Sequence, residues 1–448
     1  MKRLIHTISP ALVKLPPLIL FSHAFQKELK FLAKSQYWSK SELEEYQLSM
    51  LRRLLKHAYE NVPYYRRLFR SLKLRPEQID DFDSLKQIPP LDKDTFKRNT
   101  ILFLAKNISP WYLERVRTSG TTGKPLEFYL NRDGLMRGWA YIIHQWNRVG
   151  YTLYSLRVEI RGPPIIDQRK YEYSPLTRVI RLSPVIETRE QAEYYIKLIK
   201  KVGAEFIHGY PSAITSLSKI IEENGIDTRG CRIKAILFTS EIVYDWQREI
   251  VERVFNARTF AHYGQAEHVA TASECECSTM YHFMPQYGIV EIDPRTKEII
   301  ATGFLNWATP LIRYKTTDVA EGNILWSSKC RCGRNYYPLV EQIGGRLGDV
   351  IVTPKGTWIP PTIITNAIKG LRTINATQVI QEDEYSIIIN IEPVPGIKVS
   401  RIELKRIRDY MEKLLGNDMK IEFNIVPEIK RSSTGKFKWI ISKVARKP

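Results

Sequence analysis

The sequence predicts an α/β protein with a large N-terminal domain, built from mostly parallel sheets flanked by helices plus a β-rich part, and a small α+β C-terminal domain. Three observations lead to this prediction. Strand-like and helix-like segments alternate between 135 and 264, the pattern becomes β-rich from about 283, and a further α+β unit follows a Gly-rich turn at 344–349. With 448 residues, the chain is also too long for one compact core.

We expect the two domains to be 1–344 and 345–448, with a helical arm at 1–90. Apolar residues recur at three- and four-residue spacing in 25–38 and 42–62. The N-terminus is basic and then apolar, but its uninterrupted apolar run is too short to span a bilayer, and no small-x-small cleavage site follows. We therefore expect a cytoplasmic protein whose N-terminus either packs as an ordinary arm or contacts a membrane surface.

The net charge of +20 is concentrated at the two ends of the chain. Seven Lys and Arg residues and no acid lie between 430 and 448. A basic surplus favours polyanionic partners such as nucleotide phosphates, nucleic acid or an anionic membrane. Because no zinc-finger, RNA-binding or helix-turn-helix signature accompanies the charge, we expect no specific nucleic-acid partner.

The alternating region predicts a largely parallel sheet. Expected helices are 135–150, 189–203, 212–225 and 244–256, and expected strands are 155–162, 204–211, 233–240 and 258–264. Ligands bind such sheets beyond the C-terminal ends of the strands. Those ends carry Gly209-Tyr210-Pro211, Thr239-Ser240-Glu241 and Tyr263-Gly264-Gln265-Ala266-Glu267.

The β-rich part, 275–343, contains two C-x-C pairs, Cys275/Cys277 and Cys330/Cys332. Four thiolates can bind one tetrahedral Zn²⁺, and clustered cysteines without an export signal favour a metal site over disulfides. His282 lies close enough in sequence to replace Cys277. The alternative is a set of unliganded thiols.

The segment 118–124, TSGTTGK, combines small residues, hydroxyl groups and a lysine. Such a loop can hold phosphate oxygens, although it lacks the spacing of a Walker A loop and a plain hairpin turn would look the same.

Five motifs in order, TSGTTGKP, HYGQAEH, RYKTTDVAEG, GGRLGD and KRSSTGKFKW, resemble those of adenylate-forming enzymes. The order of the motifs, and the N-terminal segment KHAYENVPYYRRLF, are similar to the phenylacetate–CoA ligase branch and its CapK-like relatives in capsular polysaccharide biosynthesis. The resemblance departs from the family in two places. Thr317 replaces a Gly before the Asp, and Gly348 replaces the first Asp of the hinge motif, while Asp349 is kept.

The resemblance implies a role for each motif. Thr118, Ser119, Gly120, Thr121, Thr122, Gly123 and Lys124 would hold the β- and γ-phosphates of ATP. Tyr263 and Gly264 would line the adenine site, Asp318 would bind the ribose hydroxyls, and Arg346 would reach ribose or phosphate. Glu267 would hold Mg²⁺ and support catalysis. Lys436, on a mobile C-terminal lid, would be the catalytic cation.

The implied reaction is ATP-dependent activation of a carboxylic acid to an acyl-adenylate, followed by acyl transfer to CoA or to a polysaccharide precursor. The resemblance implies an acid pocket formed by Gly209, Tyr210, Ser240, Glu241 and His262, and the aromatic and small residues there suit an aryl or other compact acyl group. His262 and His208 are either polar groups of this pocket or satisfied packing residues, and packing is favoured. It also implies a zinc site near the β-rich part, where CRCGR is similar to the family pattern. A non-catalytic nucleotide-binding scaffold is the alternative from another class.

Overall fold

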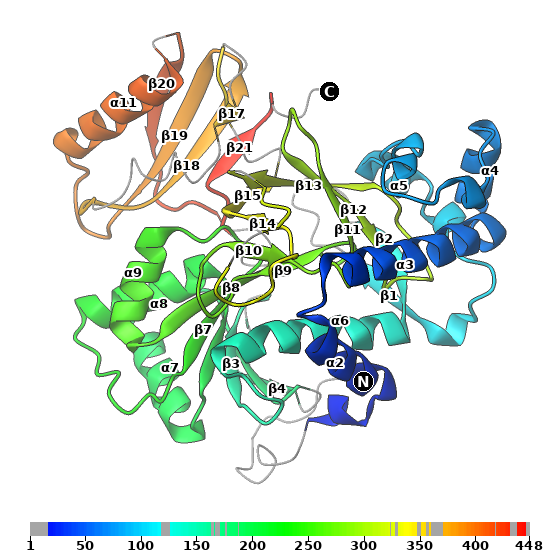
Figure 1. The fold of residues 1–448 in the computed structure, drawn as a ribbon. Helices are drawn as coiled ribbons and strands as arrows, with labels where there is room; N and C mark the ends of the chain where they lie inside the picture. The colour runs from blue at the N-terminus through cyan, green and yellow to red at the C-terminus, as the bar shows by residue number, and fades with distance from the viewer. Residues whose placement is uncertain are drawn as a thin grey trace.

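The computed structural model describes most of the chain in ranges separated by gaps. The described residues are 17–117, 126–162, 165, 171–174, 177–186, 188–322, 324–327, 330–346, 351–354, 358–359, 371–416, 418–430 and 437–444. For Leu18, Phe21, Arg117, Arg346 and Trp358 only the backbone is described. The predicted α/β class is confirmed, with a large part built on a central sheet and a smaller α+β part at the C-terminus (Figure 1).

The N-terminal region is helical, as expected. It contains α2 (His23–Ser35), α3 (Lys40–Asn61), α4 (Pro63–Ser71) and α5 (Lys93–Arg98). Ser39 and Glu42 form a capping box that starts α3. These helices pack on the β-rich part, because Gln47 Nε2 donates to the Gly288 carbonyl at 2.9 Å and the backbone N–H of Ile312 donates to the hydroxyl of Tyr65 at 2.9 Å. None of the helices that the structure describes is long and apolar enough to cross a bilayer.

The central sheet has nine strands in the order β14-β10-β9-β8-β7-β6-β3-β5-β4. The inner strands β5, β3, β6, β7 and β8 run parallel. Their bounds are β3 (Arg157–Ile160), β4 (Glu172–Ser174), β5 (Val179–Leu182), β6 (Phe206–Gly209), β7 (Ala235–Thr239), β8 (Arg258–Gly264), β9 (Thr271–Ser273), β10 (Tyr281–Phe283) and β14 (Leu339–Val340).

Helices cover both faces of this sheet (Figure 1). One face packs against α6 (Arg132–Trp146), where Trp146 clusters with Phe206 and Leu237. The other face packs against α7 (Arg189–Val202), α8 (Pro211–Glu223) and α9 (Asp245–Phe255). The predicted helix end at Gly150 is confirmed, with a left-handed φ of +81°.

Two further β-structures belong to the large part. A hairpin joins β1 (Leu113–Arg117) to β2 (Glu127–Asn131). An antiparallel sheet has the order β11-β12-β13-β15, with bounds β11 (Gly288–Ile292), β12 (Glu298–Gly303), β13 (Tyr314–Glu321) and β15 (Gln342–Arg346). The predicted β-rich texture from about residue 283 is therefore confirmed.

The C-terminal part has its own hydrophobic core. Its sheet, in the order β20-β19-β18-β21, is covered by α11 (Arg401–Leu415). The strands are β18 (Ile374–Asp383), β19 (Ser386–Pro393), β20 (Lys420–Ile425) and β21 (Ile440–Ser442), with the short pair β16 (Ile351–Val352) and β17 (Trp358–Ile359) beside them. The boundary between 344 and 345 stays a prediction.

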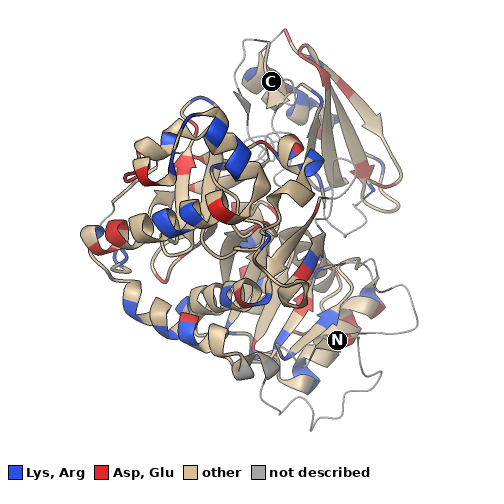
Figure 2. Ribbon diagram, turned by 90° about the vertical axis from the view of Figure 1, so that its right-hand side faces the viewer, with Lys and Arg blue, Asp and Glu red and all other residues tan. Residues whose placement is uncertain are grey.

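Charged residues of both signs are interspersed on the helices of the large part in Figure 2. The basic surplus at the chain ends falls partly outside the described residues, at 1–16, 431–436 and 445–448.

Candidate active site

Several predicted site residues lie outside the described part of the chain. These are Thr118, Ser119, Gly120, Thr121, Thr122, Gly123 and Lys124 of the phosphate-binding loop, together with Lys436. Arg346 is described only through its backbone. The described flanks of these segments are the β1–β2 hairpin, closed by the pairing of Arg117 with Glu127, and Phe437, which directly follows Lys436.

Tyr263 and Asp318 are in direct contact. The Tyr263 hydroxyl donates to Asp318 Oδ2 at 2.7 Å, and the Gln265 amide donates to the same hydroxyl. Asp318 lies opposite Arg346 in the pairing of β13 with β15. Burial, reinforced by the Asp318 carboxylate, raises the pKa of Tyr263 well above its usual value, so the hydroxyl stays a donor. The structure thus brings together Tyr263, Asp318 and the backbone of Arg346 at the C-terminal end of β8.

Glu267 is buried in the turn that follows β8. The hydroxyl of Tyr314, at the start of β13, donates to Glu267 Oε1 at 3.3 Å. Two hydrogen bonds therefore link the end of β8 and the turn after it to β13: one from Tyr263 to Asp318 and one from Tyr314 to Glu267. Carboxylate oxygens are the protein ligands that Mg²⁺ prefers, so Glu267 has the right chemistry for its predicted role.

Thr317 occupies the place where the family motif has Gly. Its φ is +67°, in the left-handed region that favours glycine. Its backbone N–H donates to Glu298 Oε1 at 3.0 Å, and the register of β12 and β13 shifts between Glu298 and Ile300. Thr317, immediately before Asp318, thus adopts a conformation that ordinarily suits glycine. It lies beside a β-bulge, and its backbone N–H is bound by the buried carboxylate of Glu298.

The predicted acid-pocket residues lie at the ends of β6 and β7. Gly209 sits so close to β3 that an added Cβ would lie 2.3 Å from the Ile160 carbonyl oxygen. Ser240 has a left-handed φ of +67°. The Tyr210 hydroxyl accepts from the Gly162 N–H at 3.3 Å. Close packing of strand ends and one strained residue are common at functional sites.

Glu241 links this pocket region to the C-terminal part. Its carboxylate accepts from the backbone N–H of Ser212 at 3.0 Å and from the Ser212 hydroxyl at 3.1 Å, at the start of α8. It also accepts from the backbone N–H of Phe437 at 3.1 Å. Trp439 packs edge-on against Tyr244, with ring centroids 5.7 Å apart. The residue after Lys436 is therefore held at the strand ends where Ser240 and Glu241 lie.

His262 is partly buried on the α6 face of the sheet. Trp146 Nε1 donates to its Nδ1 at 3.4 Å, and Thr239 Oγ1 lies 3.3 Å from its Nε2. Burial lowers the pKa of His262 well below its usual value, so the ring is neutral. His262 lines a cavity of about 420 Å³ that also includes His208 and three arginines. The sequence pattern placed His262 in a pocket but did not identify the arginines.

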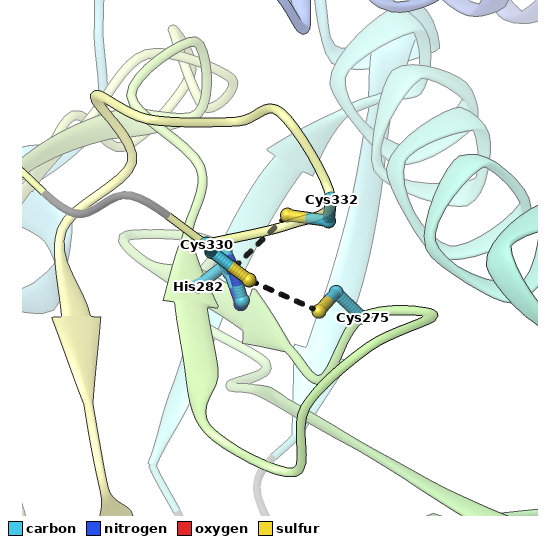
Figure 3. A group of neighbouring side chains, drawn as sticks. All are labelled: Cys275, His282, Cys330 and Cys332. Atoms are coloured by element: carbon cyan, nitrogen blue, oxygen red, sulfur yellow. Dashed lines mark hydrogen bonds between the residues drawn. The ribbon is translucent and has the colours of Figure 1, made fainter.

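Four potential metal ligands meet between β9, β10 and the 330–332 segment (Figure 3). They are Cys275, His282, Cys330 and Cys332, whose ligand atoms all lie within 4.8 Å of one another. Of the two predicted alternatives for the fourth position, the structure brings His282 to the cluster. Cys277 is exposed, and its backbone N–H donates to Cys275 Sγ at 3.3 Å.

The distances in this cluster fit tetrahedral zinc. Cys275 Sγ and Cys330 Sγ are 3.7 Å apart, and Cys332 Sγ lies 3.4 Å from His282 Nε2. Zinc–sulfur bonds of about 2.3 Å and zinc–nitrogen bonds of about 2.0 Å give edges of about 3.8 and 3.5 Å. His282 Nδ1 lies 3.1 Å from the Met280 carbonyl, which favours an Nδ1 proton and leaves Nε2 free to bind metal.

The sequence of the protein is similar to those of curated relatives along most of its length. Residues 351–443 match the family described as CapK C-terminal domain. The chain is 24% identical to Protein CapK of Staphylococcus aureus over 416 residues, which is 90% of each chain. It is 27% identical to phenylacetate-coenzyme A ligase of Escherichia coli (strain K12) over 339 residues, 70% of this chain and 73% of the relative.

Solved structures share the fold. A 2-hydroxyisobutyryl-CoA ligase in its postadenylation state, in complex with R3-HIB-AMP, matches with a TM-score of 0.71 and 16% identity over 92% of this chain and 93% of that chain. The same enzyme in its thioesterification state, with 2-HIB-AMP and CoA, matches with a TM-score of 0.56 and 17% identity at the same coverage, 92% and 93%. In sequence the chain is similar to the phenylacetate–CoA ligase and CapK-like branch of the adenylate-forming enzymes, and it shares the fold of a solved acyl-CoA ligase.

Proposed function

We propose that the protein is an adenylate-forming ligase that activates a carboxylic acid with ATP. A carboxylate oxygen attacks the α-phosphorus, the bond from that phosphorus to the bridging oxygen of the β-phosphate breaks, and pyrophosphate leaves. The acyl group then passes from AMP to an acceptor. The observation that carries this proposal is the convergence of Tyr263, Asp318, Glu267 and Glu241, with Phe437 bonded to Glu241, at one edge of the sheet.

The residues act by positioning and by charge. Asp318, acceptor-only when ionised, would bind the ribose hydroxyls, with Tyr263 orienting its carboxylate. Lys436 would stabilise the negative charge that develops between the acid and the α-phosphate. The Glu241–Phe437 hydrogen bond supports this role, because it holds the neighbour of Lys436 at the strand ends.

Two metal ions belong to the proposal. Mg²⁺, when bound, would neutralise charge on the phosphates of ATP, and Glu267 would hold it. Zn²⁺ would be structural, held by Cys275, His282, Cys330 and Cys332. Four protein ligands leave no open position for a catalytic water, which supports a structural rather than a catalytic zinc.

For the acceptor we propose CoA, as the names of the phenylacetate-coenzyme A ligase relatives suggest. The match of residues 351–443 to the CapK C-terminal domain, and the coverage of 90% with Protein CapK, favour a second candidate. In that candidate the acyl group passes to a polysaccharide precursor at a cytoplasmic membrane face. A third candidate, a non-catalytic scaffold, has no specific observation in its favour.

ATP–pyrophosphate exchange tests the proposal. With a panel of aryl, hydroxy and amino acids, the protein should exchange label with at least one acid. Lys436→Ala should lower that exchange on the order of 100-fold or more, since it removes a charge that acts on the transition state. Lys430→Ala, which alters an exposed lysine of the same segment, is the matched control and should keep full exchange. Normal exchange by Lys436→Ala would falsify the assignment of Lys436.

A further inference from the structure

The cavity beside His262 indicates the class of acid that the protein activates. One wall is formed by α6, through Trp139, Ile142 and Trp146, and the floor is formed by strands of the central sheet. Its volume, about 420 Å³, is in the usual range for small-ligand sites. His262 directly precedes Tyr263 on β8, and His208 directly precedes Gly209 on β6. The cavity thus shares His262 with the predicted acid pocket.

Its floor carries a row of alternating charges across the strands. Glu172 on β4 pairs with Arg181 on β5, Arg181 with Glu159 on β3, and Glu159 with His208 on β6. Arg181 Nε and a terminal nitrogen donate to Glu172 Oε2 at 2.9 and 2.6 Å. His208 Nδ1 lies 3.0 Å from Glu159 Oε2. The charges of Glu172, Arg181 and Glu159 are therefore largely satisfied within the row.

Two arginines flank this row. Arg157 and Arg161 lie two residues before and after Glu159, so the pleat of the strand puts all three side chains on one face. Arg157 is 1% exposed, and Nη1 donates to the Tyr151 hydroxyl at 2.7 Å and to the Thr177 carbonyl at 3.1 Å. Its guanidinium also lies 5.1 Å from the ring centroid of Trp146. Arg157 is thus held rigidly by neutral groups.

The cavity wall keeps hydrogen-bonding capacity that the described residues do not use. Arg157 Nε and His208 Nε2 are buried and have no hydrogen-bond partner in the described part of the chain. Arg161 makes no hydrogen bond or ion pair with any residue that the structure describes. Buried polar groups are seldom left this way without a ligand or water. These two atoms have almost no accessible surface, so among the described residues Arg161 is the cation that lines the cavity without a hydrogen bond or ion pair.

The charge balance favours an electron-rich ligand. Among the lining residues, Arg157, Arg161 and Arg181 oppose Glu159 and Glu172, three cations against two carboxylates. His208 and His262 are neutral, because burial lowers the pKa of each. The surplus is one positive charge. An aryl or alkyl tail would cover this charge without giving it a partner, which costs free energy.

We infer that the activated acid has an oxygen-rich tail, bearing hydroxyl groups or a second carboxylate, that binds Arg161 in this cavity. The inference rests on the proposed function, since it takes the cavity as the acyl end of the adenylation site. A hydroxyl can accept a hydrogen bond from the Arg161 guanidinium, and a carboxylate can pair with it. This differs from the aryl or compact acid expected from the sequence.

Three six-carbon acids and phenylacetate test the inference. The rate of ATP–pyrophosphate exchange should be at least about tenfold higher with adipate or gluconate than with hexanoate or phenylacetate. Only the tails of adipate and gluconate carry oxygen atoms that can bind Arg161. Adipate and gluconate separate the two chemistries, a second carboxylate and hydroxyl groups. Arg161→Leu should reduce this preference about tenfold, whereas Arg189→Leu, an exposed arginine on α7, should leave it unchanged.

Calorimetric binding of the same four acids, with AMP present, separates this inference from the proposed function. Binding of adipate or gluconate that is lost in Arg161→Leu supports the inference even if no acid gives exchange, in which case the proposed function fails. The inference is overturned if hexanoate or phenylacetate equals the oxygen-rich acids, if none of the four binds, or if Arg161→Leu keeps the preference.

Discussion

Two adjacent residues of β8 belong to regions that are built in different ways. Tyr263 faces Asp318 and the antiparallel sheet, whereas His262 faces Trp146 and the cavity under α6. The first region, which we call the nucleotide side, uses residues from short motifs in loops and at strand ends. The second, the cavity side, uses charged residues in the middle of strands. The residues proposed to bind ATP are recognisable as motifs, whereas the residues inferred to select the acid are dispersed over the sheet.

The largest expected effect concerns the cysteine cluster that adjoins the nucleotide side. β9 pairs with β8 and with β10, and Cys275 and His282 lie on or just after these strands. Cys332→Ser should release Zn²⁺ and lower the free energy of unfolding on the order of 4 kcal/mol, as loss of a structural metal can do. Metal analysis and thermal unfolding measure this.

Cys277→Ser is the matched control for that variant, because Cys277 is exposed and outside the cluster. It should keep its zinc and its melting temperature. A zinc content that falls equally in the two variants would contradict the set of four ligands that includes His282 and leaves out Cys277.

The next effect separates the two sides directly. Asp318→Ala should lower kcat/KM for adenylation about 100-fold, since hydrogen bonds to a carboxylate contribute roughly 1.5–3 kcal/mol each. The factor should be the same for every acid, because Asp318 would contact only the nucleotide. Steady-state kinetics with two acids of different tails measure it. A change in acid preference in Asp318→Ala would contradict the assignment of Asp318 to the nucleotide side alone.

The smallest effect is a pH dependence that originates on the cavity side. Burial lowers the pKa of His208 from 6.5 to about 4, although the hydrogen bond to Glu159 opposes this. Below about pH 6.5 the unfolded chain binds a proton that the folded protein does not, so stability should fall between about pH 6.5 and 4. For Glu159, burial would raise the pKa, but the His208 hydrogen bond and nearby arginines lower it from 4.5 to about 2. Its stabilisation is therefore lost only below about pH 4.5.

His208→Gln should reduce the slope of unfolding free energy against pH between 6.5 and 4.5 by the equivalent of about one proton. Chemical denaturation at several pH values measures this slope. His23→Gln, at an exposed position on α2, should leave it unchanged. If His208→Gln has the same slope as the unsubstituted protein, the conclusion that His208 is neutral in the folded protein is wrong.

The sequence pattern predicted the fold class because strands and helices alternate with clear ends, such as Gly150. It predicted the contact region of Tyr263 and Asp318 through motifs. It did not predict the charged row, because the pairing of Glu172 with Arg181 and of Arg181 with Glu159 depends on the register of strands far apart in sequence.

Part of the cavity did leave a signal in the sequence. In the segment Arg157-Val-Glu-Ile-Arg161, charged and apolar residues alternate, which indicates a strand with one polar face. The identity of the fourth metal ligand left no signal in the sequence, because C-x-C spacing does not distinguish Cys277 from His282. That choice depends on where β10 places His282, which only the three-dimensional arrangement shows.

The shared carboxylate of Glu241 has a thermodynamic consequence. Moving the C-terminal part away would break the hydrogen bond from Phe437 and the ring contacts of Trp439, while the Ser212 bonds could remain. A charge-assisted hydrogen bond and an aromatic contact together amount to about 2–4 kcal/mol. A ligand that binds one arrangement more tightly by a similar free energy would offset these contacts, and under the proposed function ATP and the acceptor are such ligands.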